Sequence, residues 1–283
     1  MDRQTESGLY KWTSLREGKK KYLYGVSGTP RGLWVTGAEG ILLYRDHETD
    51  ASWKKRPPPS EDALEGIWID GSRLWVAGGS TVLSEEQGRW RRFEIPASLK
   101  AEAVWASGEH VILSGQGVYC SHNAGQSWSA SPLPAGDYHS IFGNEQVVIS
   151  ASTNGTIARS EDRGRSWSTQ HVEHKLWGLS GTSTHLFAVG DEGLILRSKD
   201  QGKTWELTAT KTQSALHGVW ASSDGFVLAA GAGGCILSSE DFGESWIEEH
   251  SGTESFLMGA WGDSQGRLFA VGEHGVVLAR TRA

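Results

Sequence analysis

Seven copies of one short pattern run through this sequence. Each copy opens on a hydrophobic phrase, and the seven phrases are LYGVS, LEGIW, AEAVW, YHSIF, LWGLS, LHGVW and LMGAW. Their alignment brings one small residue of each into register, at intervals of 37 to 41 residues: Gly25, Gly66, Ala103, Ser140, Gly178, Gly218 and Gly259. A period of about 40 residues is typical of repeat proteins, in which each unit buries its hydrophobic face against its neighbours.

Each repeat is predicted to be β-structure. The opening phrase is followed by a second hydrophobic run such as LFAVG, a glycine-rich turn, and a third run such as GLILR. These runs are short and show no helical periodicity, which favours strands. Glycine accounts for 37 of the 283 residues and proline for only 7, so the glycines indicate turns and not disorder.

Four repeats continue into a tighter motif, S-x-D/N-x-G-x-S/T-W. It starts at Ser121, Ser160, Ser198 and Ser239. An Asp or Asn side chain can accept backbone N–H groups across a tight turn, and the glycine two residues later tolerates a positive φ. The motif therefore predicts a turn between the third and fourth strands, with its tryptophan packing within the blade. The second repeat is one residue shorter here, and the first carries an insertion, so we expect irregular turns in both.

On these residues the chain resembles the Asp-box, or BNR, repeat family. Its full repeat phrase is most similar to β-propellers of the photosystem II stability and assembly factor type, and the likeness spans almost the whole chain. The resemblance implies a propeller fold and a role in protein assembly.

The spacing of the tryptophans predicts how the ring closes. Trp53, Trp205 and Trp246 each stand 13 residues before the register residue of the next repeat, and Trp12 stands 13 before Gly25. The seventh repeat ends after its third strand, so we expect Leu9 to Leu15 to supply the missing fourth strand. Sharing the last blade between the two ends leaves no long open edge.

We therefore predict an all-β protein, a seven-bladed β-propeller of four-stranded antiparallel blades closed by the N-terminal strand. One domain covers residues 1–283. Residues 1–20 form the outer strand of blade 7 and a link, and the blades begin near residues 21, 62, 100, 137, 175, 214 and 254.

One position changes its chemistry from repeat to repeat while its neighbours stay alike. It precedes the register residue and reads Tyr24, Glu65, Glu102, His139, Trp177, His217 and Met258. At the head of each innermost strand, these side chains should converge on the mouth of the central channel. A concave site with mixed polar and aromatic groups favours ligand or peptide capture, so we predict that these seven residues bind a partner.

The leading functional interpretation is a non-enzymatic protein-interaction scaffold or assembly factor. Tyr24, Trp177 and Met258 would be apolar anchors, while Glu65 and Glu102 would favour a basic or aromatic partner segment. We assign no catalytic residue and expect no cofactor.

Two enzymatic or ligand-binding alternatives stay open. A metal-dependent lyase or hydrolase could use mixed carboxylate and imidazole ligands from Glu65, Glu102, His139 and His217. A glycan-binding or glycoside-hydrolase propeller could use Glu65 and Glu102 as a carboxylate pair. No arginine occupies the mouth position, which argues against a sialidase.

Charge and hydropathy argue against several other classes of protein. The net charge is −7, which argues against a nucleic-acid partner. No apolar run approaches the length that membrane insertion needs, and the first residues do not resemble a secretory signal, so we expect a cytoplasmic protein. Cys120 and Cys235 lie in apolar runs and should be buried thiols.

Overall fold

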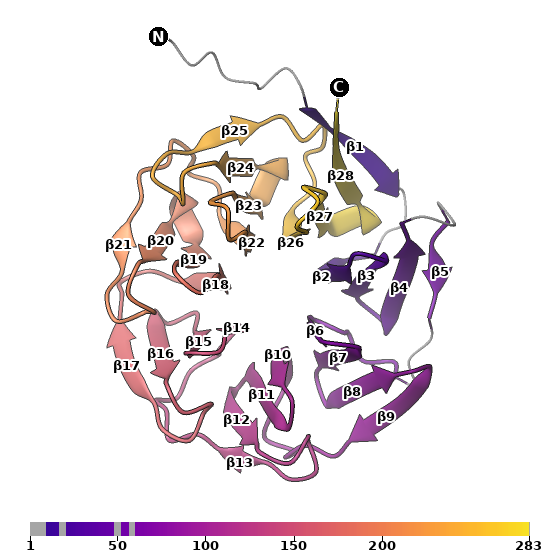
Figure 1. Cartoon of the computed structure of the whole chain (residues 1–283), viewed down its shortest axis with the longest axis vertical. Coiled ribbons are helices and arrows are strands. Elements are labelled where there is room, and N and C mark those ends of the chain that lie inside the picture. The colour runs from indigo at the N-terminus through magenta and orange to yellow at the C-terminus, as the bar shows by residue number, and fades with distance from the viewer. Residues whose placement is uncertain (1–9, 17–20, 48–51, 57–59, 283) are drawn as a thin grey trace.

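The repeats fold into a ring of seven blades around a central channel. The structure, a computed structural model, describes residues 10–16, 21–47, 52–56 and 60–282. Every blade is a four-stranded antiparallel sheet, and in blades 1 to 6 the chain passes from the channel outwards through the four strands (Figure 1). The predicted fold class is thereby confirmed. The described part of the chain contains no helix long and apolar enough to cross a membrane.

The strands follow the repeats in order. Blades 1 and 2 contain β2 (Leu23–Thr29), β3 (Gly32–Gly37), β4 (Ile41–Asp46) and β5 (Lys54–Lys55), then β6 (Gly66–Asp70), β7 (Arg73–Gly78), β8 (Thr81–Glu86) and β9 (Arg89–Phe93). Blades 3 and 4 contain β10 (Ala101–Ser107), β11 (His110–Gly115), β12 (Gly117–Ser121) and β13 (Ser129–Ala130), then β14 (Ser140–Gly143), β15 (Val148–Ala151), β16 (Thr156–Ser160) and β17 (Ser168–His171).

Blades 5 and 6 contain β18 (Leu176–Gly181), β19 (Leu186–Gly190), β20 (Ile195–Ser198) and β21 (Glu206–Leu207), then β22 (Leu216–Ala221), β23 (Val227–Gly231), β24 (Ile236–Ser239) and β25 (Ile247–Glu249). Blade 7 contains β26 (Leu257–Gly262), β27 (Leu268–Gly272) and β28 (Val277–Arg282). Single 3-10 turns join the second and third strands of the last three blades: η2 (Asp191–Gly193), η3 (Ala232–Gly234) and η4 (Glu273–Gly275).

The N-terminal strand closes the ring, as the spacing predicts. Strand β1 (Tyr10–Arg16) pairs antiparallel with β28 and completes the sheet of blade 7. Trp12 is buried there, and its indole N–H donates to Oε2 of Glu249 in blade 6 at 2.8 Å. Leu9, the expected first residue of this strand, lies outside the described residues.

Hydrophobic clusters between neighbouring blades form the core. One cluster joins Phe187, Val189 and Ile195 of blade 5 to Leu216 and Val219 of blade 6. The tryptophan at the equivalent place of each fourth strand packs in or against such a cluster, and these residues are Trp12, Trp53, Trp90, Trp128, Trp167, Trp205 and Trp246. The repeated tryptophans thus serve packing, as predicted, and the clusters that they join lie between neighbouring blades as well as within them.

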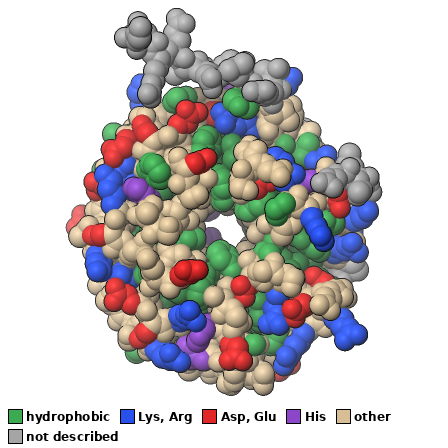
Figure 2. Space-filling model, in the orientation of Figure 1, with side chains coloured by type: hydrophobic (Ala, Val, Ile, Leu, Met, Phe, Trp, Pro, Cys, Tyr) green, Lys and Arg blue, Asp and Glu red, His purple; other side chains and the backbone are tan. Residues whose placement is uncertain are grey.

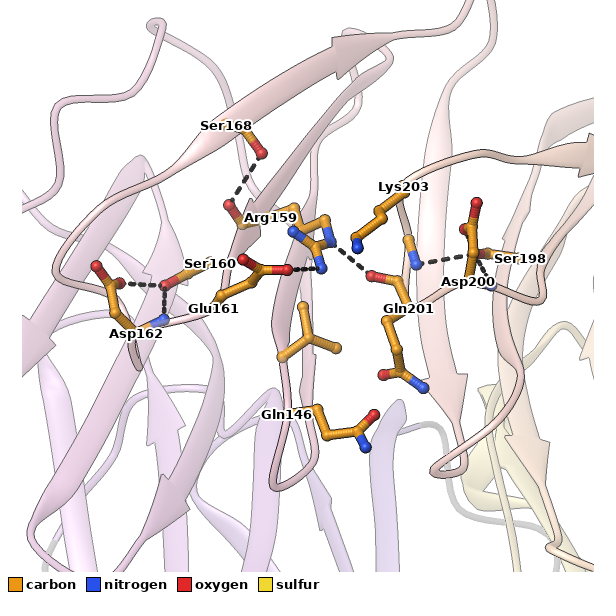
Figure 3. A network of polar contacts seen from close by, with 12 residues as sticks. Gln146, Arg159, Ser160, Glu161, Asp162, Ser168, Ser198, Asp200, Gln201 and Lys203 are labelled. Carbon is orange, nitrogen blue, oxygen red and sulfur yellow. Dashed lines mark hydrogen bonds and ion pairs between the residues drawn. The ribbon is translucent and has the colours of Figure 1, made fainter.

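The S-x-D/N-x-G-x-S/T-W segments form hydrogen-bonded turns. In blade 4, Asp162 accepts the backbone N–H of Ser166 at 2.8 Å and the hydroxyl of Ser160 at 2.8 Å, while Gly164 adopts a φ of 88°. Arg159 then reaches the next blade and donates to the carbonyl oxygen of Gln201 at 2.6 Å (Figure 3). The turns therefore both close their own hairpins and tie blades together.

The structure also bears on the predictions for the two irregular repeats and the two cysteines. In blade 2, Glu86 pairs directly with Arg89, so the shortened motif makes a tighter turn. The insertion of the first repeat falls partly on residues 48–51, which lie outside the described residues. Cys120 and Cys235 are buried free thiols, as expected.

Candidate functional site at the channel mouth

All seven predicted site residues line one cavity. Its volume is about 790 Å³, and Figure 2 shows the hollow at the centre of the ring. Each of the seven side chains is partly buried and partly exposed, and the list is Tyr24, Glu65, Glu102, His139, Trp177, His217 and Met258. The structure therefore brings together every residue that the variable position selects.

A recurring β-bulge aims these side chains. In blade 5, Leu176 pairs with Gly190 and Gly178 pairs with Val189, so Trp177 is an extra residue in the strand. The same register shift falls at Glu102, His217 and Met258, and in blade 1 between Leu23 and Val26. Bulges change the direction of a side chain and are common next to functional sites. Because the bulged residue points out of the sheet, it does not have to pack as its neighbours do, and its residue type can differ from blade to blade.

Close approach of the inner strands lets mouth residues of adjacent blades touch. A methyl group at Gly178 would come within 2.1 Å of the carbonyl oxygen of His217. The absence of a side chain at this register position therefore allows the heads of β18 and β22 to lie side by side.

Aromatic rings form one side of the mouth. The rings of Trp177 and His217 stack with centroids 4.5 Å apart, and Phe256 meets His217 edge-on, also at 4.5 Å. The indole N–H of Trp177 donates to Oδ1 of Asp191 at 2.7 Å, which fixes the ring orientation. Burial, followed by the charge of His139, lowers the pKa of His217 to about 4. His217 is therefore a neutral, largely apolar ring at pH 7.

Carboxylates form the other side. Oε2 of Glu102 lies 2.6 Å from Nδ1 of His139 in the next blade. Glu65 makes no side-chain hydrogen bond or ion pair with any described residue. Burial, and next the negative charge of Glu102, raises the pKa of Glu65, while His139 opposes this. Burial and the charge of Glu65 likewise raise the pKa of Tyr24. The mouth therefore contains one paired carboxylate and one unpaired carboxylate.

Two aromatic residues that contact the lining side chains escaped the sequence reasoning. Phe256 lies two positions before Met258, outside the variable position, and Tyr22 stands at the same place before Tyr24 and stacks on it at 6.3 Å. An aromatic residue two places before the variable position was the available signal. Trp68, Trp220 and Trp261 also line the cavity.

The arrangement offers limited metal chemistry. The rings of His139 and His217 lie 6.2 Å apart, and the described residues include no group of three or more His, Cys, Asp or Glu placed to hold a metal ion. The Glu102–His139 pair could move a proton, because a carboxylate on Nδ1 leaves Nε2 of the imidazole available.

Comparison with known proteins shows the fold. No protein-family model matches the sequence, and no curated protein matches it. The structure is similar to YCF48 from Cyanidioschyzon merolae, with a TM-score of 0.76 and 16% identity over 95% of this chain and 98% of that one. It is similar to YCF48 bound to a D1 peptide, with a TM-score of 0.77 and 17% identity over 98% and 99%.

An enzyme shares the architecture equally well. A streptogramin B lyase superposes with a TM-score of 0.84 and 13% identity over 99% of this chain and 100% of that one. At these identities the likenesses establish the fold alone. The chain is thus a seven-bladed β-propeller similar in structure to YCF48 and to a streptogramin B lyase.

Proposed function

We propose that this protein is a non-enzymatic interaction scaffold that captures a segment of a partner protein at the channel mouth. The observation that carries the proposal is the division of a single cavity into an aromatic side and a carboxylate side. Such a cavity suits a peptide with two kinds of side chain, because burial of an aromatic anchor supplies affinity and charge complementarity supplies selectivity.

The partner segment carries a basic residue. Glu65 is largely removed from water, carries a raised pKa and has no partner among the described residues. A desolvated carboxylate without a partner is costly, and a Lys or Arg side chain entering the mouth would relieve that cost. Glu102 already contacts His139, so Glu65 is the more available of the two.

The same segment carries an aromatic or large apolar residue. The stacked rings of Trp177 and His217, with Phe256 against them, present an apolar wall whose orientation Asp191 fixes. A rigid aromatic wall binds another ring at little entropic cost. Tyr24 and Met258 extend the apolar lining on the side of blades 7 and 1.

The resemblance to assembly factors supports this class of function. The printed description of one structural neighbour is YCF48 bound to a D1 peptide, and the Asp-box pattern of the sequence is in keeping with that group. We propose by analogy that this chain acts in the cytoplasm as an assembly or interaction factor for a specific partner protein. We propose no cofactor for this role.

Selection from a random peptide display library tests the proposal. We expect enrichment of peptides that combine Lys or Arg with an aromatic residue, and we expect binding to weaken in Trp177→Ala and Glu65→Gln. Leu207→Ala, which changes an exposed residue on the outer strand β21, is the matched control and should leave binding unchanged. If the enriched peptides bound the wild type and the three variants equally, capture would take place outside the mouth, which would contradict the proposal.

One observation favours a second function, that of a lyase. The Glu102–His139 contact of 2.6 Å places a carboxylate-oriented imidazole in the cavity, and a streptogramin B lyase shares the fold. Incubation with streptogramin B, followed by mass spectrometry, tests this directly. A linearised product from the wild-type protein but not from His139→Ala would support the lyase, and unchanged substrate would remove this candidate.

A further inference from the structure

The outer strand of blade 2 differs from most other outer strands in length and in charge. Strand β9 (Arg89–Phe93) is the last strand of its sheet and has five residues, more than any other outer strand described in blades 1 to 6. Three of the five are arginines, and all three are exposed. The outer strands β13, β17, β21 and β25 contain no lysine or arginine. In a chain of net charge −7, β9 therefore concentrates positive charge at the rim, and Figure 2 shows Lys and Arg side chains along the rim over blades 1 and 2.

The alternation of side chains places two of these arginines on one face of the strand. Successive residues of a strand point to opposite faces, so Arg89, Arg91 and Phe93 share a face. Phe93 is buried in the hydrophobic cluster that joins blade 2 to blade 3, and the guanidinium of Arg91 lies over its ring, 4.9 Å from the centroid. This contact orients Arg91. Arg89 and Arg91 are therefore two exposed cations with the spacing of alternate residues in a strand.

The carboxylates of the neighbouring strand β8 do not neutralise this pair. Oε2 of Glu86 lies 2.8 Å from Nη2 of Arg73, and Glu85 accepts a backbone N–H in the turn between β8 and β9. Arg89 and Arg91 form no ion pair with any residue that the structure describes. Acidic side chains of another molecule could therefore pair with both guanidinium groups.

The outer edge of β9 also presents backbone groups. Within the described part of the chain, β9 pairs with β8 on one side and with no strand on the other. Such an edge can accept an additional strand. Like charges directly opposite each other destabilise strand pairing, whereas opposite charges stabilise it. The three arginines therefore disfavour a second copy of β9 and favour a strand that carries carboxylates.

We propose that β9 binds an acidic, extended segment of a partner protein as a fifth strand of blade 2. Glutamate or aspartate at alternate positions of that segment would lie opposite Arg89 and Arg91. Exposed ion pairs contribute little individually, so backbone hydrogen bonds supply most of the affinity and the arginines select acidic sequences. This surface is separate from the channel mouth, where the predicted site residues lie at the heads of the innermost strands.

Titration of the full chain with a capped peptide of alternating glutamate and threonine tests the proposal. Amide hydrogen exchange in β9 should slow when the peptide is added at low ionic strength, while exchange in β21 of blade 5 should not change. The double variant Arg89→Gln, Arg91→Gln should bind about tenfold more weakly. The matched control is Arg163→Gln, Arg165→Gln, which removes the same charge from two exposed arginines in blade 4 and should bind as the wild type does.

Altered peptides separate strand addition from simple charge attraction. A peptide with glutamine in place of glutamate should not slow exchange in β9, because the charges are gone. N-methylation of all threonines, or of all glutamates, removes the backbone N–H groups from one edge of the peptide only, so one of these two peptides should lose binding.

Three results would overturn the proposal. The first is undiminished binding of both N-methylated peptides, and the second is wild-type affinity in the double variant at β9. The third is binding to phosphatidylserine vesicles without any response to the peptide, which would assign the basic edge to a membrane surface. Loss of peptide capture at the channel mouth, as in Trp177→Ala, should leave binding at β9 unchanged, so the two sites can be tested separately.

Discussion

Oε2 of Glu102 lies 2.6 Å from Nδ1 of His139, although the two residues are 37 positions apart and belong to neighbouring blades. The contact occurs because a bulge turns Glu102 out of its strand towards the channel. It assigns a partner to one of the two mouth carboxylates and leaves Glu65 without one among the described residues. The unpaired state of Glu65 has consequences for both stability and binding.

Replacement of Glu65 by Gln should stabilise the fold while weakening capture of basic peptides. The carboxylate is desolvated and unpaired, so its removal should raise the free energy of unfolding at pH 7 by about 1 kcal/mol. Urea denaturation of both proteins measures this change. Glu192→Gln, at an exposed carboxylate beside Asp191 in η2, is the control and should have no effect.

The pH dependence of this stabilisation has a definite sign. Since the pKa of Glu65 is higher in the folded than in the unfolded state, the folded state holds its proton more tightly. Wild-type stability should therefore fall, relative to Glu65→Gln, as the pH rises from about 4.3 through the raised pKa. A constant difference between the two proteins from pH 4 to 7 would contradict an unpaired, desolvated carboxylate.

Replacement of Trp177 by Ala should weaken binding without unfolding the ring. The indole is a partly exposed wall of the cavity that stacks on His217, and central aromatic residues typically contribute about 2 kcal/mol or more to binding. We expect a loss of about 30-fold in affinity for a selected peptide, measured by fluorescence anisotropy. Equal affinity of Trp177→Ala and the wild type would argue that the aromatic wall is not part of the binding surface.

Replacement of Trp12 by Ala should open the ring. Trp12 is 8% exposed and joins the N-terminal strand to Glu249 of blade 6. Truncation of a buried tryptophan costs about 3 kcal/mol or more, and denaturant unfolding should show that loss. Trp12→Phe, which retains the ring packing but not the indole N–H, should lose less. If both variants matched the wild type, the closure of blade 7 would contribute nothing to stability.

Replacement of Asp162 by Ala should destabilise blade 4 in a pH-dependent way. Although burial opposes the shift, hydrogen bonds from Ser166 and Ser160 lower the pKa of Asp162 to about 2. The stabilisation is therefore present above pH 4 and lost as the pH falls towards 2. We expect a loss of about 1–3 kcal/mol at pH 7, with Asp162→Asn milder because Asn123 serves in the same place in blade 3. Identical acid unfolding of Asp162→Ala and the wild type would contradict this role.

Much of this architecture could be predicted from the sequence, because the same pattern occurs seven times and each repeat can be aligned with the others. The 13-residue spacing of Trp12 predicted the shared blade, and the variable position selected seven residues that prove to line one cavity. The contacts between these seven side chains could not be predicted from the sequence. The stacking of Trp177 on His217 depends on bulges and on the close approach at Gly178, which no residue pattern reports.

At the other end of blade 3, Nδ1 of His110 lies 3.0 Å from Nδ1 of His122, and this contact shows the same limit. Each histidine lies in a turn-flanking position with no repeat to mark it, and only the register of β11 against β12 makes them neighbours. Phe256 was missed for a related reason, since its place two positions before Met258 is aromatic in blades 1 and 7 alone among the seven.

The tryptophan indole signals of a ¹⁵N-labelled sample offer the most direct test of the channel mouth as the binding site. Trp177→Phe identifies the Trp177 signal, and addition of a selected peptide should shift it strongly, since this indole lines the cavity and its N–H donates to Asp191. Trp167 and Trp205, which pack in the hydrophobic clusters between blades, should keep their positions. Shifts confined to Trp167 and Trp205, with Trp177 unmoved at saturation, would contradict capture at the mouth.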